Sequence, residues 1–141
     1  MKPFVAPGMQ VEAPDDWMDA SNYILAGPPI QDGRASLVVT LARKVPDPGL
    51  GPYLDRQLPD LKKLQNFSLK SRDRSSVAGM EAIMLEFTWK QPAGPVLHQR
   101  QWYAWAAGNV YTLTATAPEA AFAGMLPVFN KMIETFKPKQ W

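Results

Sequence analysis

The stretch Glu81–Thr116 decides the fold: EAIMLEFTWKQPAGPVLHQRQWYAWAAGNVYTLTAT. Runs rich in β-branched and aromatic residues alternate here with short segments of glycine, proline and asparagine, a pattern typical of antiparallel hairpins. The pattern predicts strands over Glu81–Trp89, Val96–Ala106 and Asn109–Thr116. A further strand is expected over Phe67–Ser75, so the four segments together predict an antiparallel meander.

Two strands and a helix are expected before the meander. Asn22–Ala26 is a short apolar segment that ends at a run of glycine and proline, and Ala35–Arg43 alternates in the manner of a second strand. Leucines at helical spacing predict a helix from about Tyr53 to Leu64. Pro59 lies inside this helix and should kink or interrupt it, because proline lacks a backbone N–H.

A final helix is expected to follow Pro118, since proline suits the first helical position. Its apolar residues recur on one stripe that should pack on the sheet: Phe122, Met125, Leu126, Phe129, Met132, Ile133 and Phe136. The order of elements predicts one domain over residues 1–141 in the α+β class. We expect an antiparallel sheet with the helices packed on one face.

The composition is that of an ordinary globular protein. The 141 residues are 46% hydrophobic and 20% charged, and the formal net charge is +2. The basic residues are scattered, whereas nucleic-acid-binding proteins usually gather lysine and arginine on one face. The densest alternation, Lys70, Arg72 and Arg74, is better explained as a solvated strand face, so we expect no nucleic-acid partner.

The N-terminal stretch lacks the apolar run of a signal peptide, because Pro3, Pro7 and Pro14 interrupt it. No uninterrupted apolar run is long enough to span a bilayer, so we expect a cytoplasmic protein that does not insert into membranes. The absence of cysteine excludes disulfides, thiolate metal sites and a cysteine nucleophile.

The residues give little support for catalysis or for a bound cofactor or metal. His98, the single histidine, lies within a predicted strand with no serine motif beside it. Asp15, Asp16 and Asp19 lack the glycine and the distal glutamate of a calcium loop, and no glycine-rich loop opens a helix. We therefore expect a protein that is not an enzyme, and a small enzyme using His98 and the acidic cluster is the weakest hypothesis.

Apolar side chains occupy both faces of the predicted meander. Side chains alternate along a strand, so Trp102 points away from Tyr103 and Trp105. The helices can cover one face, and the other face needs a second cover. That cover is either the N-terminal segment, a dimer partner, or a ligand chain held in an apolar groove.

Four strings resemble segments of a known family. DWMDASN (Asp16–Asn22), YLDRQL (Tyr53–Leu58), HQRQWY (His98–Tyr103) and TATAPEAAF (Thr114–Phe122) resemble segments of the Eag chaperones of bacterial type VI secretion. The resemblance runs in order from about Val11 to Phe136. It implies a DcrB-like fold related to that of the PsbP proteins, a homodimer without catalytic activity, and a role in shielding the N-terminal transmembrane helices of PAAR-containing effectors before export.

Glutamines on the groove of that family bind the effector helices. Matching strings carry this role to Gln57 and Gln101, with Gln99 as a further candidate. The alternative interpretation of all three is an ordinary surface amide. The N-terminal stretch through Pro14 departs from the family in being richer in proline and less strand-like.

The groove floor is expected from the first two predicted strands. Ile24, Val38 and Thr40 form one candidate set, and Leu37 and Val39 are the alternative if the facing is reversed. Alternation determines which residues share a face but not which face is open.

A competing hypothesis is a PsbP-like or DcrB-like accessory protein that stabilises an envelope complex without handling transmembrane helices. Such proteins are often exported, so the missing signal favours the chaperone hypothesis.

Overall fold

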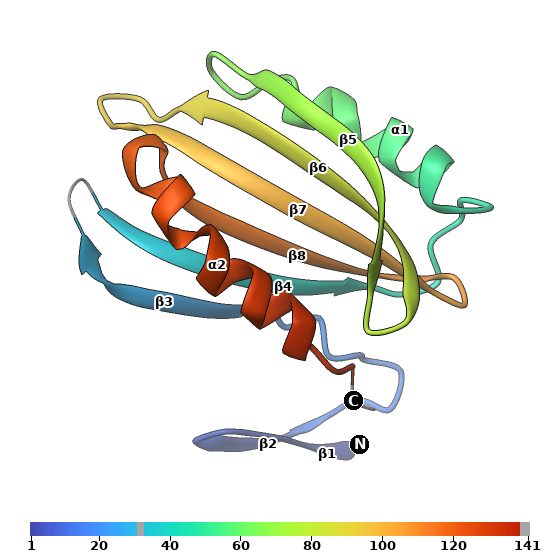
Figure 1. Cartoon of the computed structure of the whole chain (residues 1–141). Helices are drawn as coiled ribbons and strands as arrows, with labels where there is room; N and C mark the ends of the chain where they lie inside the picture. Colours follow the sequence, from blue (N-terminus) through green and yellow to red (C-terminus); the bar gives the residue numbers. More distant parts are fainter. Residues whose placement is uncertain (31–32, 139–141) are drawn as a thin grey trace.

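The computed structural model describes residues 1–30 and 33–138 of the chain. Their helices and strands follow one another in this order: β1 (Lys2–Ala6), β2 (Met9–Ala13), β3 (Tyr23–Ile30), β4 (Gly33–Ala42), α1 (Leu50–Leu61), β5 (Ser68–Val77), β6 (Met80–Lys90), β7 (Val96–Ala106), β8 (Asn109–Pro118) and α2 (Glu119–Thr135). Figure 1 shows one large twisted sheet, two helices and a separate N-terminal hairpin.

The large sheet has six strands in the order β3-β4-β8-β7-β6-β5, and every neighbouring pair is antiparallel. Strands β5 to β8 form the expected meander, and the bounds of β7 are those predicted. Strand β4 pairs with β8, so the chain must cross the sheet between β4 and β5, and α1 lies on this crossing (Figure 1). The α+β class with an antiparallel sheet is confirmed.

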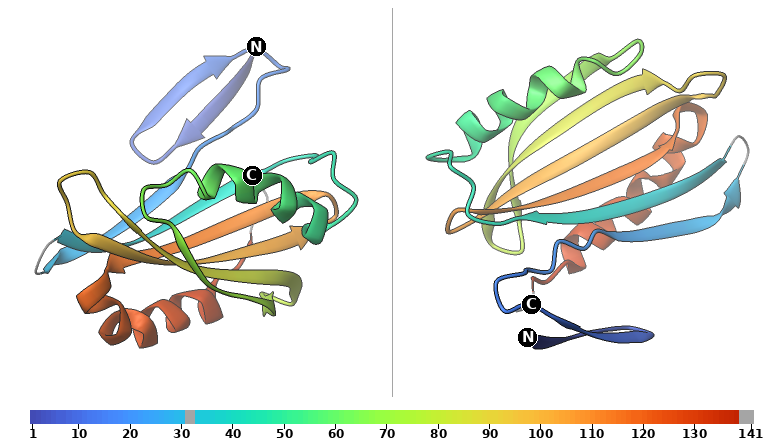
Figure 2. Two further views of the ribbon diagram at one scale, coloured as in Figure 1. Left: turned by 90° about the horizontal axis from the view of Figure 1, so that it is seen from above. Right: turned by 180° about the vertical axis from the view of Figure 1, so that it is seen from behind.

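The two helices lie on opposite faces of the sheet, not on one face as expected (Figure 2). Helix α2 packs its predicted apolar stripe over the face that carries Trp102 and Leu113. Helix α1 covers part of the other face, where Leu54 packs with Phe87 and Tyr103. The reason is the alternation of apolar side chains, because it gives both faces of β6 and β7 a surface that must be buried.

Tight turns join the strands of the meander. Ala78–Gly79 and Ala107–Gly108 both have positive φ at their two central positions, 51° and 78° in the first turn and 51° and 86° in the second. This is the type I′ geometry, whose twist matches that of the flanking strands. The turns hold β6 and β8 in register with their neighbours.

Several predicted boundaries differ from those observed. Strand β3 continues past Ala26 through Pro28 and Pro29, with a shift of register against β4. The prolines are tolerated because β3 is an edge strand and needs N–H donors on one side only. Helix α1 begins at Leu50, three residues before Tyr53, and ends at Leu61, two residues after Pro59.

The proline-rich N-terminus forms strands, contrary to its weak strand character in the sequence. Strands β1 and β2 pair through a turn at Pro7 and Gly8, and Gly8 has φ 79°. Proline fixes the first central position of such a turn and glycine supplies the positive φ at the second. The hairpin projects from the body on the side of α1 (Figure 2).

Candidate functional site

Part of the α1 side of the sheet has no helix above it. Helix α1 covers β6, part of β7 and the start of β8, whereas β3, β4 and the later part of β8 are left uncovered (Figure 2). We call this uncovered surface the open face. Its residues point to the same side of four adjacent strands: Ile24, Val38, Thr40, Gln99, Gln101, Thr112, Thr114 and Thr116.

The register brings these residues into rows across the sheet. Ile24 lies opposite Val38, Val38 lies opposite Thr114, and Thr114 lies opposite Gln101. Directly opposed residues of neighbouring antiparallel strands point to the same side. One row therefore runs from the edge strand β3 to β7, and it passes from apolar to polar side chains.

Exposure distinguishes the two faces of the same strands. Ile24 is 67% exposed, and Thr114 and Thr116 are half-buried. Their neighbours Ala115 and Ala117, which point to the α2 side, are 0% exposed. The open face is thus the accessible side of β8, whose other side is fully packed. On the edge strand β3 both sides are exposed, since Leu25 points away from Ile24 and is 57% exposed.

Both glutamines of the open face are fixed by hydrogen bonds. Gln99 accepts from Trp89 Nε1 at 2.6 Å and donates from Nε2 to Thr116 Oγ1 at 2.8 Å. Gln101 donates from Nε2 to Thr114 Oγ1 at 3.2 Å and accepts a short hydrogen bond from the hydroxyl of Tyr103. The contacts specify the orientation of each amide, because donor and acceptor ends have different partners.

Each fixed amide retains hydrogen-bonding capacity. A primary amide has two N–H donors and two acceptor lone pairs, and each glutamine uses one of each among residues 1–30 and 33–138. Burial raises the pKa of the Tyr103 hydroxyl well above its ordinary value, so this group stays protonated and remains a donor to Gln101. The open face therefore presents preoriented donors and acceptors beside apolar side chains.

The structure places most of the sequence-predicted residues on this surface. Ile24, Val38 and Thr40 share it with Gln99 and Gln101. The alternative pair lies on the opposite side of β4, where Leu37 is 5% exposed and Val39 packs against the core under α2. The geometry thus separates the two sets that alternation left open.

Gln57 lies on α1, apart from the other two glutamines. It is half-buried and occupies the same stripe of the helix as Tyr53, Leu54 and Leu58, which packs toward the sheet. No side-chain hydrogen bond joins Gln57 to another residue within 1–30 and 33–138. Gln57 therefore lies on the helix that covers the neighbouring part of the α1 side of the sheet, and not on the open face itself.

Sequence reasoning missed the threonines of β8. Thr112, Thr114 and Thr116 alternate with Leu113 and Ala115, and the structure places the threonines on the open face. The signal was present in the TLTATA string, since an alternation of polar and apolar residues indicates one packed and one accessible face. The missing information was that the accessible face adjoins Gln99 and Gln101.

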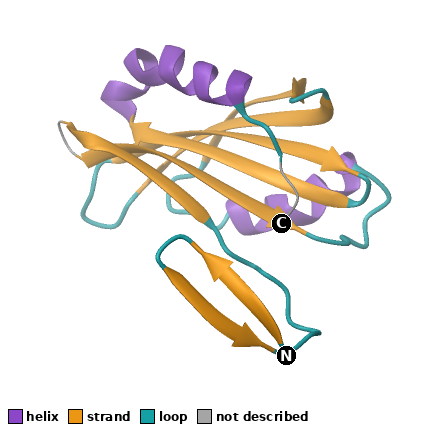
Figure 3. Cartoon of the chain, turned by 90° about the horizontal axis from the view of Figure 1, so that it is seen from below, coloured by secondary structure: helices purple, strands orange, loops and turns teal. Residues whose placement is uncertain are grey.

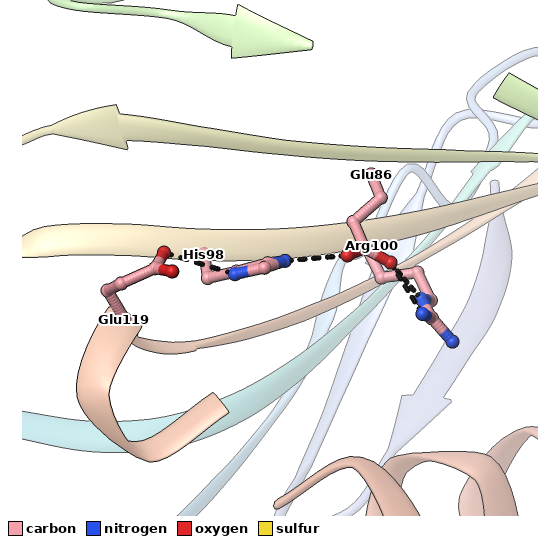
Figure 4. Close-up of polar contacts among 4 residues, drawn as sticks. All are labelled: Glu86, His98, Arg100 and Glu119. Carbon is pink, nitrogen blue, oxygen red and sulfur yellow. Dashed lines mark hydrogen bonds and ion pairs between the residues drawn. The ribbon is translucent and has the colours of Figure 1, made fainter. Parts of the chain in front are cut away.

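A second polar cluster lies on the α2 side of the sheet (Figure 4). Glu86 accepts hydrogen bonds from His98 Nε2 at 2.9 Å and from Arg100 Nε at 2.7 Å, while His98 Nδ1 lies 3.1 Å from a carboxylate oxygen of Glu119. Histidine can donate to both carboxylates only when both ring nitrogens carry a proton. The His98 ring also stacks on Phe122, with the ring centroids 3.8 Å apart.

The cluster ties the start of α2 to the sheet. Burial alone would raise the pKa of Glu86, but the hydrogen bonds from His98 and Arg100 outweigh burial and lower this pKa. Glu119 is the first residue of α2 and Phe122 belongs to its first turns, so two of the three partners of His98 belong to the helix and the third, Glu86, belongs to β6. His98 therefore lies between two carboxylates, that of Glu86 on β6 and that of Glu119 on α2.

The acidic cluster near the N-terminus forms a turn. Asp19 Oδ1 accepts a hydrogen bond from the backbone N–H of Ser21 at 2.8 Å, and the side chain of Ser21 together with this N–H lowers the pKa of Asp19. Residues 1–30 and 33–138 contain no group of three His, Cys, Asp or Glu side chains arranged to hold a metal ion. Within the same residues, neither helix is long and apolar enough to cross a bilayer.

Solved structures share this architecture. The chain superimposes on the Pseudomonas aeruginosa protein PA94, described as a protein of unknown function and putative regulator, with a TM-score of 0.80 and 26% identity over 100% of this chain and 99% of the other. LpqN of Mycobacterium tuberculosis, which is involved in cell envelope biogenesis, gives a TM-score of 0.58 at 15% identity over 86% and 85% of the two chains.

Cyanobacterial PsbP (CyanoP) from Synechocystis sp. PCC 6803 gives a TM-score of 0.57 at 11% identity, over 95% of this chain and 100% of the other. The PsbP-like character of the fold is thereby shown. No curated protein sequence is a significant match. The DcrB family model matches residues 9–135, which include the whole six-stranded sheet and both helices, and the chain therefore belongs to the DcrB family.

Proposed function

We propose that this protein is a type VI secretion chaperone whose open face binds and shields the apolar N-terminal transmembrane helices of a PAAR-containing effector before export. The observation that supports the proposal is the composition of the open face. Apolar Ile24 and Val38 lie there beside Gln99 and Gln101, whose amides are already oriented. The resemblance to the Eag chaperones indicates which class of protein is bound, and we call this bound protein the client.

The open face suits a helix better than an extended chain. An extended peptide binds a sheet through backbone hydrogen bonds along an edge strand, and these bonds are not available on a sheet face. A helix forms its backbone hydrogen bonds internally, so it can lie on a sheet face and bury apolar side chains there. Each large apolar side chain that becomes buried stabilises the complex by about 1.5 to 3 kcal/mol before ordering costs.

The polar part of the open face adds selectivity. Transmembrane helices carry occasional serine, threonine and exposed carbonyl groups, which need partners once they leave water. The unused N–H groups of Gln99 and Gln101 can donate to such carbonyls, and each hydrogen bond contributes about 0.5 to 1.5 kcal/mol. Gln57, which is half-buried on α1, provides a further amide on the α1 side of the sheet. Chaperones of this kind need no catalytic group, and we include the absence of enzymatic activity in the proposal.

Co-expression with the apolar N-terminal region of a PAAR-containing effector encoded beside this chain tests the proposal. The wild-type chain should keep that region soluble in a complex of defined mass, measured by pull-down and light scattering. Ile24→Asp should abolish the complex, because a carboxylate at the 67% exposed position would be desolvated by an apolar helix.

The matched control is Val128→Asp, which makes the same kind of change at a 50% exposed position of α2, on the other side of the sheet. It should leave the complex intact, and circular dichroism should show that both variants are folded. Equal loss of binding in both variants, or no complex with the wild type, contradicts the proposal.

The second candidate is an accessory protein of an envelope complex that does not hold transmembrane helices. LpqN, whose fold is similar, is involved in cell envelope biogenesis. If the wild-type chain never retains an apolar helix but copurifies with envelope proteins, this second candidate replaces the chaperone.

A further inference from the structure

The N-terminal hairpin has one apolar face. Phe4 lies opposite Val11 and Ala6 lies opposite Met9, so these four side chains point to the same side. Gln10, the next residue after Met9, points to the other side. Met9 and Val11 are each 50% exposed, so the apolar face is largely uncovered in the structure.

The hairpin stands away from the six-stranded sheet. Figure 3 shows β1 and β2 projecting beyond the sheet, and among the described helices and strands their only extensive contacts are with each other. An isolated two-stranded hairpin is at best marginally stable in water. The hairpin therefore gains stability when its apolar face packs on another surface.

The open face is a second uncovered surface, and it lies on the same side of the sheet as the hairpin (Figure 2). Its apolar residues Ile24 and Val38 lie opposite each other on β3 and β4, and Ile24 is 67% exposed. Strand β3 is the edge of the sheet, and Figure 1 shows the hairpin just beyond this edge. The apolar part of the open face is therefore the part nearest to the hairpin.

Residues 14–22 connect the hairpin to β3 and can act as a hinge. Two hydrogen bonds close local turns within this tether: the N–H of Trp17 donates to the carbonyl oxygen of Pro14 at 3.0 Å, and the N–H of Ser21 donates to Asp19 Oδ1 at 2.8 Å. Neither bond joins the tether to the sheet. The nine tether residues span up to about 30 Å when extended, whereas three adjacent strands occupy only about 10 Å. The tether is thus long enough for the hairpin to turn onto β3, β4 and β8.

The two surfaces also match in shape. Each strand of the hairpin has five residues, a length of about 17 Å, and the apolar faces of two sheets pack against each other about 10 Å apart. A hairpin lying on β3 and β4 forms a small sandwich with Ile24 and Val38. This arrangement covers both uncovered apolar surfaces at once.

We propose that residues 1–13 form a lid, which packs the apolar face of the hairpin on Ile24 and Val38 of the same chain until a client helix displaces it. The proposal rests on the proposed function, since it describes how the client site is regulated. The projecting hairpin of the structure is the open state of this lid (Figure 3). The closed lid removes the apolar part of the open face from water when no client is present, so a client must compete with it.

Disulfide formation within one chain tests the lid without a client. The full chain has no cysteine, so introduced thiols have no native competitor. Met9→Cys with Val38→Cys should form a disulfide under mild oxidation at low protein concentration, measured as a product of monomer mass without free thiols. Gln10→Cys with Val38→Cys is the matched control and should react several-fold more slowly, because Gln10 has nearly the same tether but points away from the apolar face. Equal rates for the two pairs, or a disulfide that joins two chains, overturns the proposal.

Client binding provides a second measurement, with the apolar N-terminal effector region of the co-expression experiment as the probe. Met9→Asp combined with Val11→Asp should hold the lid open, because closure would desolvate two carboxylates. A site that is closed in about nine of ten molecules binds about tenfold more weakly than an open one, so the double variant should bind the probe up to about tenfold more tightly. Val5→Asp makes the same kind of change on the other side of the hairpin and should leave the affinity unchanged.

Unchanged or weaker binding by the double variant overturns the lid, as does an equal gain in affinity with Val5→Asp. The two measurements also separate the lid from the function on which it rests. A chain that cross-links as expected but never binds the probe supports the lid and contradicts the proposed chaperone function. A chain that binds the probe but shows equal cross-linking rates supports the chaperone function and overturns the lid.

Discussion

Replacing Glu86 with glutamine tests whether the charge network beneath α2 stabilises the fold. The side chains of Glu86, His98 and Arg100 are 17%, 12% and 20% exposed, so water screens their contacts only in part. Glutamine keeps the shape of Glu86 but leaves Arg100 without its counter-ion. Charge-assisted hydrogen bonds contribute about 1.5 to 3 kcal/mol and loss of one partner of a fully buried pair costs about 3 to 5 kcal/mol. For this partly buried network we expect Glu86→Gln to lower the free energy of unfolding by about 2 to 3 kcal/mol near pH 7.

The effect should depend on pH in a defined direction. The hydrogen bonds from His98 and Arg100 hold the pKa of Glu86 below its ordinary value of 4.5, although burial opposes them. A carboxyl group whose pKa is lowered on folding stabilises the native state above its unfolded pKa, and this contribution is lost as the pH falls through the folded pKa. Glutamine does not titrate. The stability difference between wild type and variant should therefore be full near pH 7 and should shrink below about pH 4.

Urea unfolding followed by tryptophan fluorescence near pH 7 and at about pH 3 measures this difference. Glu81→Gln is the matched control, because Glu81 is exposed on the same strand, and it should change the free energy of unfolding by less than about 0.5 kcal/mol. A loss that is equally large at both pH values would show that glutamine perturbs packing instead of charge. No loss near pH 7 would show that the network does not stabilise the fold.

Three further variants test the core, a turn and the support of the open face, each by urea unfolding. Phe129→Ala should cost about 3 to 5 kcal/mol, because Phe129 is 2% exposed under the sheet and its removal leaves a cavity. Ala107→Asn should raise the free energy of unfolding by roughly 0.5 to 1 kcal/mol, since asparagine tolerates the observed φ of 51° better than alanine. Tyr103→Phe should cost about 1 to 2 kcal/mol by removing the donor to Gln101, and it should also weaken client binding in the pull-down assay.

The sequence was sufficient to predict the meander because its signals are local. Alternation over Val96–Ala106 specifies a strand and the facing of each residue, and the turn at Ala107–Gly108 specifies where the strand ends. The structure confirms that Trp102 points to the opposite side of β7 from Tyr103 and Trp105. These features depend on neighbours within one or two hairpins.

Features that depend on distant parts of the chain could not be predicted in the same way. The pairing of β4 with β8 forces the chain to cross the sheet, and this crossing places α1 on the face opposite to α2. Until α1 is placed, Val38 and Leu37 are equivalent candidates, since alternation does not say which face is covered. The N-terminal hairpin was not predicted for a different reason. Pro7–Gly8 is a recognisable turn signal, but the surrounding prolines outweighed it in the sequence.

The open face has a composition that a chaperone for apolar helices would require. A fully apolar sheet face of this extent would associate with other molecules, and a fully polar face would not bury apolar side chains. Strand β8 resolves this conflict by placing small apolar residues such as Ala115 on the packed side and Thr114 and Thr116 on the accessible side. The threonines accept from Gln101 and Gln99, so the surface meets water with satisfied polar groups and still has unused donors. Apolar side chains are concentrated instead at β3, where Ile24 is 67% exposed on the open face.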